Sequence, residues 1–140
     1  MRLQIAHFQM RLGRLIESLA LMLLTPDDLL ELNRLRYSRA GTVDLWSDQE
    51  TVTRGLYPQE QELLARVPLK QGRALVIGVG GGREAIPLAQ AGFAVTGLDF
   101  IPEMVARAKE NALRHGIKLA GLVQEISRLD VPANSFDLAI

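Results

Sequence analysis

An apolar run that opens into a cluster of glycines constrains this chain more than any other feature. Residues Ala74–Gly82 read ALVIGVGGG. Glycine lacks a Cβ, so this loop can adopt positive φ angles and let a ligand lie against its backbone, beside the free N–H groups of a following helix. A second apolar run, 93–98, ends in Asp99, 21 positions after Gly78. This separation is expected when two parallel strands end side by side and the carboxylate binds a ribose, so the pattern predicts a nucleotide-cofactor pocket.

The pattern after residue 72 alternates between strands and helices. We expect strands at 74–79 and 93–98, helices at about 83–91 and 102–115, a weaker strand within 118–124 and a further strand from Phe136. Gly92 and Gly116 are expected to end the two helices. Pro87 predicts a loose first turn or a later helix start, near Glu84. The order predicts an α/β fold with a Rossmann-like parallel sheet and flanking helices.

Two helices are expected ahead of the sheet, as a hairpin over residues 1–40. In the first, apolar residues recur every three or four positions, at Ile5, Phe8, Leu12, Leu15, Leu19 and Met22. This stripe favours packing against the rest of the chain or a second copy; a basic membrane-surface helix is the alternative. Thr25 and Pro26 predict the start of the second helix, which should end by about Ser38.

The segment 41–72 is expected to connect this hairpin to a cofactor domain over residues 73–140. Residues 41–58 lack a helical or strand period, so we expect an ordered loop there and a short helix at 59–67. Trp46 and Tyr57 in this loop are expected to pack the hairpin against the sheet, and a lid over the cofactor is the alternative.

Composition limits the partners and sites that this sequence indicates. At 140 residues and 48% hydrophobic, the chain can build one core. Sixteen basic residues balance sixteen acidic ones, so no nucleic-acid partner is indicated. The chain has no cysteine and only two distant histidines, which favours a cytoplasmic protein without a metal site. The longest apolar run of the first helix, Leu19–Leu24, is too short to span a membrane, and we expect no membrane partner.

The segment from about Gln59 to Ile140 resembles the first half of the class I methyltransferases that use S-adenosylmethionine. The resemblance rests on ALVIGVGGGREAIPLAQAGFAVTGLDFIPEMVARAKENA and on VQEISRLDVPANSFDLAI. It implies an enzyme that transfers a methyl group from S-adenosylmethionine to an acceptor that the sequence does not identify. The cofactor-binding residues that it implies are Gly78, Val79, Gly80, Gly82, Asp99, Phe100, Met104, Glu125 and Ile126.

Each of these residues takes its expected role from the resemblance. The glycine loop would surround the methionine part of the cofactor, Asp99 would hold the ribose, and Glu125 would meet the adenine amino group. Phe100 and Ile126 match positions that flank the adenine, and Met104 matches the start of the second helix of the domain. Each role has a structural alternative: a tight turn for the glycines, a helix cap for Asp99 and a solvated charge for Glu125.

The chain also departs from the family pattern. Val76 stands where many members carry an acid, and Glu84 is a hypothetical substitute for the missing contact. The sequence stops inside the fourth expected strand, which implies a truncated sheet with an apolar face open to the hairpin or to a second copy, and possible self-association. No catalytic residue is assigned, because a catalytic base in this family usually follows the fourth strand.

Two other function classes are compatible with the same residues. The dinucleotide fingerprint G-x-G-x-x-G would need a glycine at Arg83, but Gly80, Gly82 and Ala85 provide a G-x-G-x-x-A variant. A nicotinamide-dependent oxidoreductase is therefore one alternative. A non-catalytic module that binds cofactor, or a partner through residues 1–40, is the other.

Overall fold

The computed structural model describes the backbone from residue 2 to residue 140 and divides the chain into two compact units that meet between Arg36 and Tyr37. The first unit consists of α1 (Arg2–Leu23) and most of α2 (Pro26–Tyr37). Thr25 and Asp28 cap α2 reciprocally, because the Thr25 amide donates to the Asp28 carboxylate (2.9 Å) and the Asp28 amide donates to the Thr25 hydroxyl (3.2 Å). This cap confirms the predicted start of the second helix.

The apolar stripe of α1 is exposed wherever its side chains are described. Phe8, Leu12, Leu15 and Leu19 are each between 45% and 66% exposed, and the side chain of Ile5 lies outside the described residues. Association of this stripe with a second copy or with the rest of the chain stays a prediction. Within the described part of the chain, no helix is both long and apolar enough to cross a membrane.

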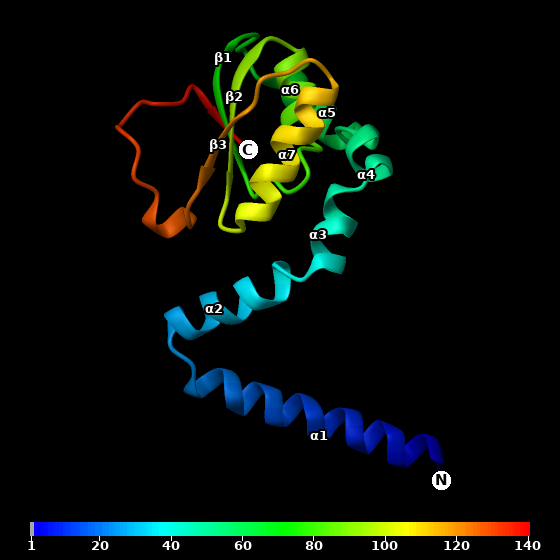
Figure 1. Cartoon of the computed structure of the whole chain (residues 1–140). Coiled ribbons are helices and arrows are strands. Elements are labelled where there is room, and N and C mark those ends of the chain that lie inside the picture. Colours follow the sequence, from blue (N-terminus) through cyan, green and yellow to red (C-terminus); the bar gives the residue numbers. More distant parts are fainter. Residues whose placement is uncertain (1) are drawn as a thin grey trace. The chain divides into compact units, whose positions relative to one another are not determined.

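A four-stranded parallel sheet organises the second unit (Figure 1). Its strands are β1 (Gly72–Ile77), β2 (Phe93–Asp99), β3 (Ala120–Val123) and β4 (Leu138–Ala139), in the order β3-β2-β1-β4. Because β2 and β3 lie to one side of β1 while β4 lies to the other, the strand order reverses at β1. Ligands of open α/β sheets bind beyond the carboxyl ends of the strands at such a reversal. The predicted α/β fold with a parallel sheet is confirmed.

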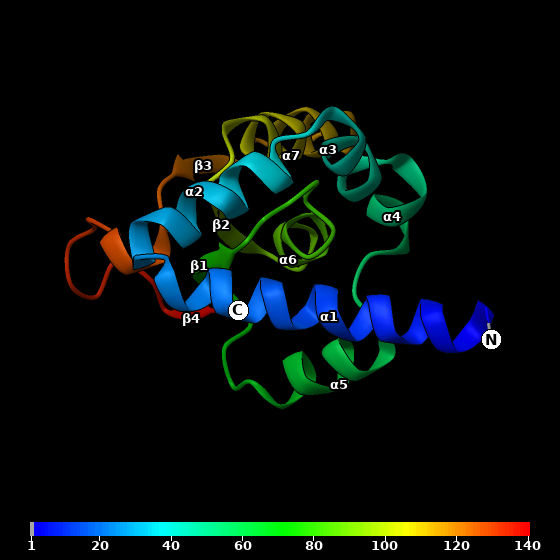
Figure 2. The same cartoon turned by 90° about the horizontal axis from the view of Figure 1, so that it is seen from below.

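Helices cover one face of this sheet. Figures 1 and 2 show α5 (Pro58–Arg66), α6 (Ala85–Gln90) and α7 (Pro102–Arg114) on the same side of the strands. The strand side chains on this face form the main core with apolar residues of the helices. The core includes Ala74, Val76, Leu88, Val95 and Ala108.

The opposite face of the sheet is only partly covered. Alternation along β1 and β2 puts Leu75, Ile77 and Leu98 on this face. Leu75 and Leu98 are buried, but Ile77 is 44% exposed. The segment between β3 and β4, which includes the short 3-10 helix η1 (Ile126–Arg128), runs along this side (Figure 1). The expected open apolar face is therefore reduced to part of the sheet.

The connection ahead of α5 corrects the sequence-based expectation. Residues 41–58 are not a loop, because α3 (Ala40–Ser47) and α4 (Gln49–Arg54) occupy most of them. Asp48 caps α4 by accepting a hydrogen bond from the Thr51 amide at 3.0 Å. Helices of eight and six residues are too short to show a clear period, and packing stabilises them instead, with Val43 and Val52 buried.

The helix after the glycine cluster begins later than residue 83. It starts at Ala85, and Pro87 therefore lies in its first turn, where a missing N–H costs no intrahelical hydrogen bond. Gly92 and Gly116 have φ angles of 105° and 72°, which confirms that they terminate the two helices.

Candidate cofactor site

The glycine loop follows β1 directly and adopts the conformation that only glycine takes readily. Gly78 and Gly80 have φ angles of 68° and 51°. A Cβ added to Gly78 would have no neighbour within 4 Å, so the space above this residue is open. The loop can therefore present its backbone to a ligand at the carboxyl end of β1.

Asp99 ends β2 and connects this loop to α7. One carboxylate oxygen accepts a hydrogen bond from the Gly80 amide at 3.1 Å, and the other accepts one from the Ile101 amide at 3.0 Å. The residue is only 8% exposed. A carboxylate has about four acceptor positions, so these two bonds leave capacity for the hydroxyl groups of a ligand. Asp99 does not cap α7 directly, because the residue before that helix is Ile101.

A cavity of about 220 Å³ opens at this place. It brings together five of the nine predicted residues, Gly78, Gly80, Asp99, Phe100 and Met104. The predicted glycine loop and acid, which are 21 positions apart in the sequence, thus line one pocket at the carboxyl ends of β1 and β2.

The other four predicted residues lie outside the described lining of this cavity. Val79 is 1% exposed and packs over Gly97, where an added Cβ would come within 2.6 Å of its side chain. Gly82 packs against Ala108 of α7. Glu125 precedes η1, where it accepts a hydrogen bond from the Ser127 hydroxyl (2.7 Å), and Ile126 is 52% exposed. Contact of these residues with a cofactor stays a prediction.

Three further residues line the cavity, namely Tyr37, Trp46 and Ile101. Tyr37 was missed because it lies at the end of α2, far from the glycine loop in sequence. Its ring meets the ring of Phe100 edge to face, with centroids 6.3 Å apart. Trp46, on α3, lines the cavity, whereas Tyr57 is absent from its lining and stacks with its ring centroid 4.4 Å from the Arg83 guanidinium carbon.

Arg83 anchors the far end of the glycine loop to α5. Its guanidinium donates to both carboxylate oxygens of Glu60, at 2.8 and 2.9 Å, and to the carbonyl oxygen of Gly55 at 2.9 Å. It also pairs with Glu84. The position that would hold the third glycine of the dinucleotide fingerprint is therefore the centre of a half-buried ion pair, in which the Arg83 side chain is 16% exposed.

This ion pair predicts a pH dependence of stability. The hydrogen bonds from Arg83 lower the pKa of Glu60 from its ordinary value of 4.5, so the pair stabilises the fold above that value and loses its effect as pH falls through the lowered pKa. Glu60→Gln should cost about 1 kcal/mol of unfolding free energy at pH 7. In urea titrations at several pH values, this difference from wild type should shrink between about pH 5 and pH 3. Glu62→Gln is the control, because it removes only an exposed pair with Arg66 on the same helix and should change stability by less than about 0.5 kcal/mol. A pH-independent difference for Glu60→Gln would contradict the expectation.

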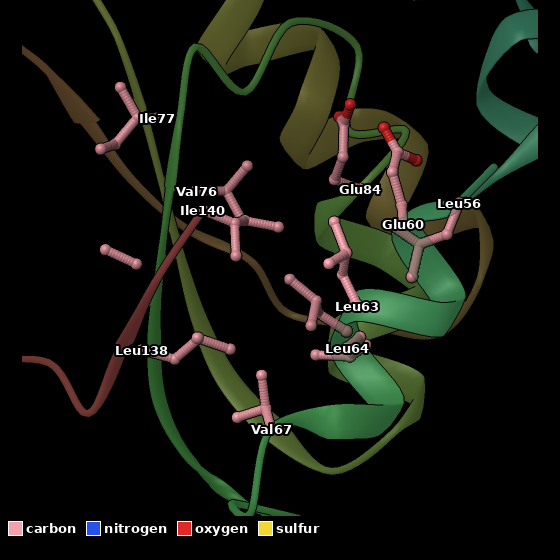
Figure 3. Close-up of a pocket in the computed structure, with 12 residues that line it drawn as sticks. Leu56, Glu60, Leu63, Leu64, Val67, Val76, Ile77, Glu84, Leu138 and Ile140 are labelled. Atoms are coloured by element: carbon pink, nitrogen blue, oxygen red, sulfur yellow. The ribbon is translucent and has the colours of Figure 1, made fainter. Parts of the chain in front are cut away.

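A second, larger hollow of about 400 Å³ lies between α5 and the strands β1 and β4. Figure 3 shows Leu63 and Leu64 of α5 facing Leu138 and Ile140 across it, with Glu60 and Glu84 at one end. Aliphatic side chains dominate its lining, and it contains neither the open glycine backbone nor Asp99. We therefore place the cofactor site in the smaller cavity.

The lining of this hollow includes Val76, which stands where many family members carry an acid, and Glu84, the hypothetical substitute for that acid. Val76 lines it and is 2% exposed, so its side chain belongs to the core. Glu84 lines the same hollow and pairs with Arg83. The structure thus offers no support for Glu84 as a substitute contact to the cofactor.

Comparisons with known proteins agree with this geometry. A family model described as "Methyltransferase domain" matches residues 74–140. Among curated proteins, a phosphatidylethanolamine N-methyltransferase of Cereibacter sphaeroides is 37% identical over 78 residues, which are 54% of this chain and 38% of that protein. This chain therefore spans well under half the length of that relative.

Solved structures show the same fold. An S-adenosylmethionine-dependent methyltransferase of Methanosarcina mazei is 32% identical with a TM-score of 0.50, over 61% of this chain and 41% of that one. A phosphoethanolamine N-methyltransferase of Haemonchus contortus, solved with S-adenosylhomocysteine, has a TM-score of 0.60 at 20% identity, over 83% of this chain and 26% of that one. Residues 74–140 therefore match a methyltransferase domain, and the second unit has the fold of the class I S-adenosylmethionine-dependent methyltransferases.

Proposed function

We propose that this protein is a methyltransferase that binds S-adenosylmethionine between the glycine loop and Asp99. One observation supports this most directly: the Asp99 carboxylate and the open backbone of Gly78 line one cavity, joined by the hydrogen bond from the Gly80 amide. The open space above Gly78 suits a ligand that lies against the main chain. The free acceptor positions of Asp99 suit the two hydroxyl groups of a ribose.

The residues of this chain would act by binding and orienting. When bound, the sulfonium cofactor supplies the reactive methyl group. Asp99 would hold the ribose, Phe100 and Met104 would supply apolar contacts, and the loop would fix the position of the remaining part of the cofactor. No side chain of the described site needs to move a proton. The relatives' names span N- and O-methyltransferases, so they do not agree on one acceptor. A cytoplasmic location likewise stays a prediction.

Calorimetric titration separates this function from the oxidoreductase alternative. S-adenosylhomocysteine should bind at one site per chain, with a dissociation constant of roughly 1 µM to 1 mM, the usual range for enzyme ligands. NADH should give no binding heat under the same conditions. Tight NADH binding without S-adenosylhomocysteine binding would reverse the assignment.

A transfer assay tests activity beyond binding. The chain is incubated with methyl-labelled S-adenosylmethionine and two model acceptors, phosphatidylethanolamine vesicles and a catechol. Labelled product from either acceptor supports the enzyme. A chain that binds the cofactor but labels neither acceptor, and loses association with its partners when residues 1–40 are deleted, would favour the non-catalytic module.

A further inference from the structure

The side chain of Asn111 on α7 connects this helix to α3, to the glycine loop and to the start of α4. It is 2% exposed, and its amide nitrogen donates to the carbonyl oxygens of Ser47 (3.2 Å) and Gly81 (3.0 Å). Its amide oxygen accepts hydrogen bonds from the side chains of Gln49 and Arg114, each at 3.2 Å. Both donors and both acceptor positions of this amide are therefore used.

The end of α3 lies directly on the glycine loop at the same place. The Gly81 amide donates to the carbonyl oxygen of Trp46 at 3.2 Å. A Cβ placed on Gly81 would lie 2.5 Å from the Cα of Ser47 and 2.5 Å from that carbonyl oxygen, so no side chain fits between the two segments. The contact is therefore between the backbones of α3 and the glycine loop. The Asn111 side chain donates a hydrogen bond to each of these two segments.

This contact decides which side chains form the wall of the cofactor cavity. Trp46 immediately precedes Ser47, and it lines the cavity together with Gly78 and Gly80 of the glycine loop. Trp46 is 52% exposed, which leaves surface available to a ligand. Val43, three residues earlier on α3, packs on Ile101 and Met104, which line the same cavity. The position of α3 thus sets the position of Trp46.

We infer that Asn111 is a positioning residue that holds α3 against the glycine loop and so makes Trp46 a fixed wall of the cofactor pocket. The inference rests on the proposed function. Asn111 is not among the residues that line the cavity, so it acts on the cofactor through Gly81 and α3. Without its two donors, the carbonyl groups of Ser47 and Gly81 lose their shared partner and α3 can separate from the loop.

The test compares Asn111→Leu with wild type, because leucine has a similar size but no polar atoms. Affinity for S-adenosylhomocysteine, measured by calorimetry, should fall about 10- to 100-fold. Hydrogen exchange of the α3 amides should accelerate. Trp46 is the single tryptophan of the chain, so its fluorescence reports on this wall alone. Quenching of Trp46 by acrylamide should increase in the variant without ligand, and the emission change on adding ligand should become smaller.

Two controls separate positioning from general stability. Leu88→Ala removes a fully buried side chain from the core away from the cavity, so it should destabilise the fold while leaving the affinity of the folded protein unchanged. Asn33→Leu makes the same substitution at an exposed site in α2 and should change nothing. If Asn111→Leu does not fold, Asn111→Ala carries the test, because it removes both donors without placing a bulky or charged group against the two carbonyl oxygens.

The outcomes are distinguishable. Wild-type affinity in the folded Asn111 variant would overturn the inference, whatever its effect on stability, and so would unchanged Trp46 quenching. An affinity loss in Leu88→Ala as large as in Asn111→Leu would reduce Asn111 to a structural role and also overturn it. If wild type itself binds no S-adenosylhomocysteine, the proposed function fails and this inference fails with it. A loss confined to the Asn111 variants supports both.

Discussion

Asp99→Ala should lower the affinity for S-adenosylhomocysteine by about 100-fold or more. Hydrogen bonds to a charged group contribute about 1.5–3 kcal/mol each, and the proposed site loses two of them to the ribose. Each 1.4 kcal/mol is a factor of about ten in the dissociation constant. The substitution also removes the acceptor of the Gly80 and Ile101 amides, so the loop itself loses its anchor.

Calorimetry on the variant and on two controls tests this expectation. Asp99→Asn keeps the size and one carbonyl oxygen, but its side-chain NH2 group would face a backbone N–H donor and could not accept a hydrogen bond from it. We therefore expect an intermediate loss of affinity. Asp130→Ala removes an exposed acid from the segment between β3 and β4 and should bind like wild type. A loss of less than about threefold in Asp99→Ala would exclude a ribose contact by this carboxylate, since it corresponds to under about 0.7 kcal/mol.

Leu88→Ala should reduce the unfolding free energy of the second unit by about 3 kcal/mol, within the usual range of about 2–5 kcal/mol for this change in a core. Leu88 is 0% exposed and packs between α6 and the sheet. It also borders the hollow of about 400 Å³, so the space that it leaves would merge with existing empty volume. Neighbouring side chains cannot easily collapse into a space of that size, so the loss should exceed the lower end of the range.

Urea unfolding followed by far-ultraviolet circular dichroism measures this loss. Leu113→Ala is the matched control, because it is the same substitution on α7 at a side chain that is 71% exposed. Alanine is the better helix former, so this control should stay within about 0.5 kcal/mol of wild type. A loss below about 1 kcal/mol for Leu88→Ala would show that α6 is not packed on the sheet as described.

The strands β1 and β2 and the acid at the end of β2 could be predicted because their sequence signals are local. An apolar run ending in glycine or in Asp99 marks a buried strand and its carboxyl end, and the parallel register of β1 and β2 then puts the two ends together. Helix ends were predicted equally well where a special residue controls them, as Thr25 does for α2 and Gly116 for α7.

The failures concern segments whose structure depends on distant contacts. Residues 41–58 were expected to form a loop, but Val43 and Val52 are buried against other elements and hold α3 and α4 in place. The Asp48 cap was the one local signal available there. Glu125 and Ile126 lie at the start of η1, outside the described lining of the cavity, and their contact with a cofactor stays a prediction.

The amino-acid sequence by itself determined the parallel α/β core, the glycine loop and the acid that faces it, because backbone conformation and burial along one strand depend on residues close in the chain. Only the tertiary structure decided that α3 forms a wall of the pocket, that Asn111 bonds both Ser47 and Gly81, and that Arg83 pairs with Glu60. Each of these contacts joins residues at least 23 positions apart. Such pairs form only when packing of the core brings their elements together, so no local pattern encodes them.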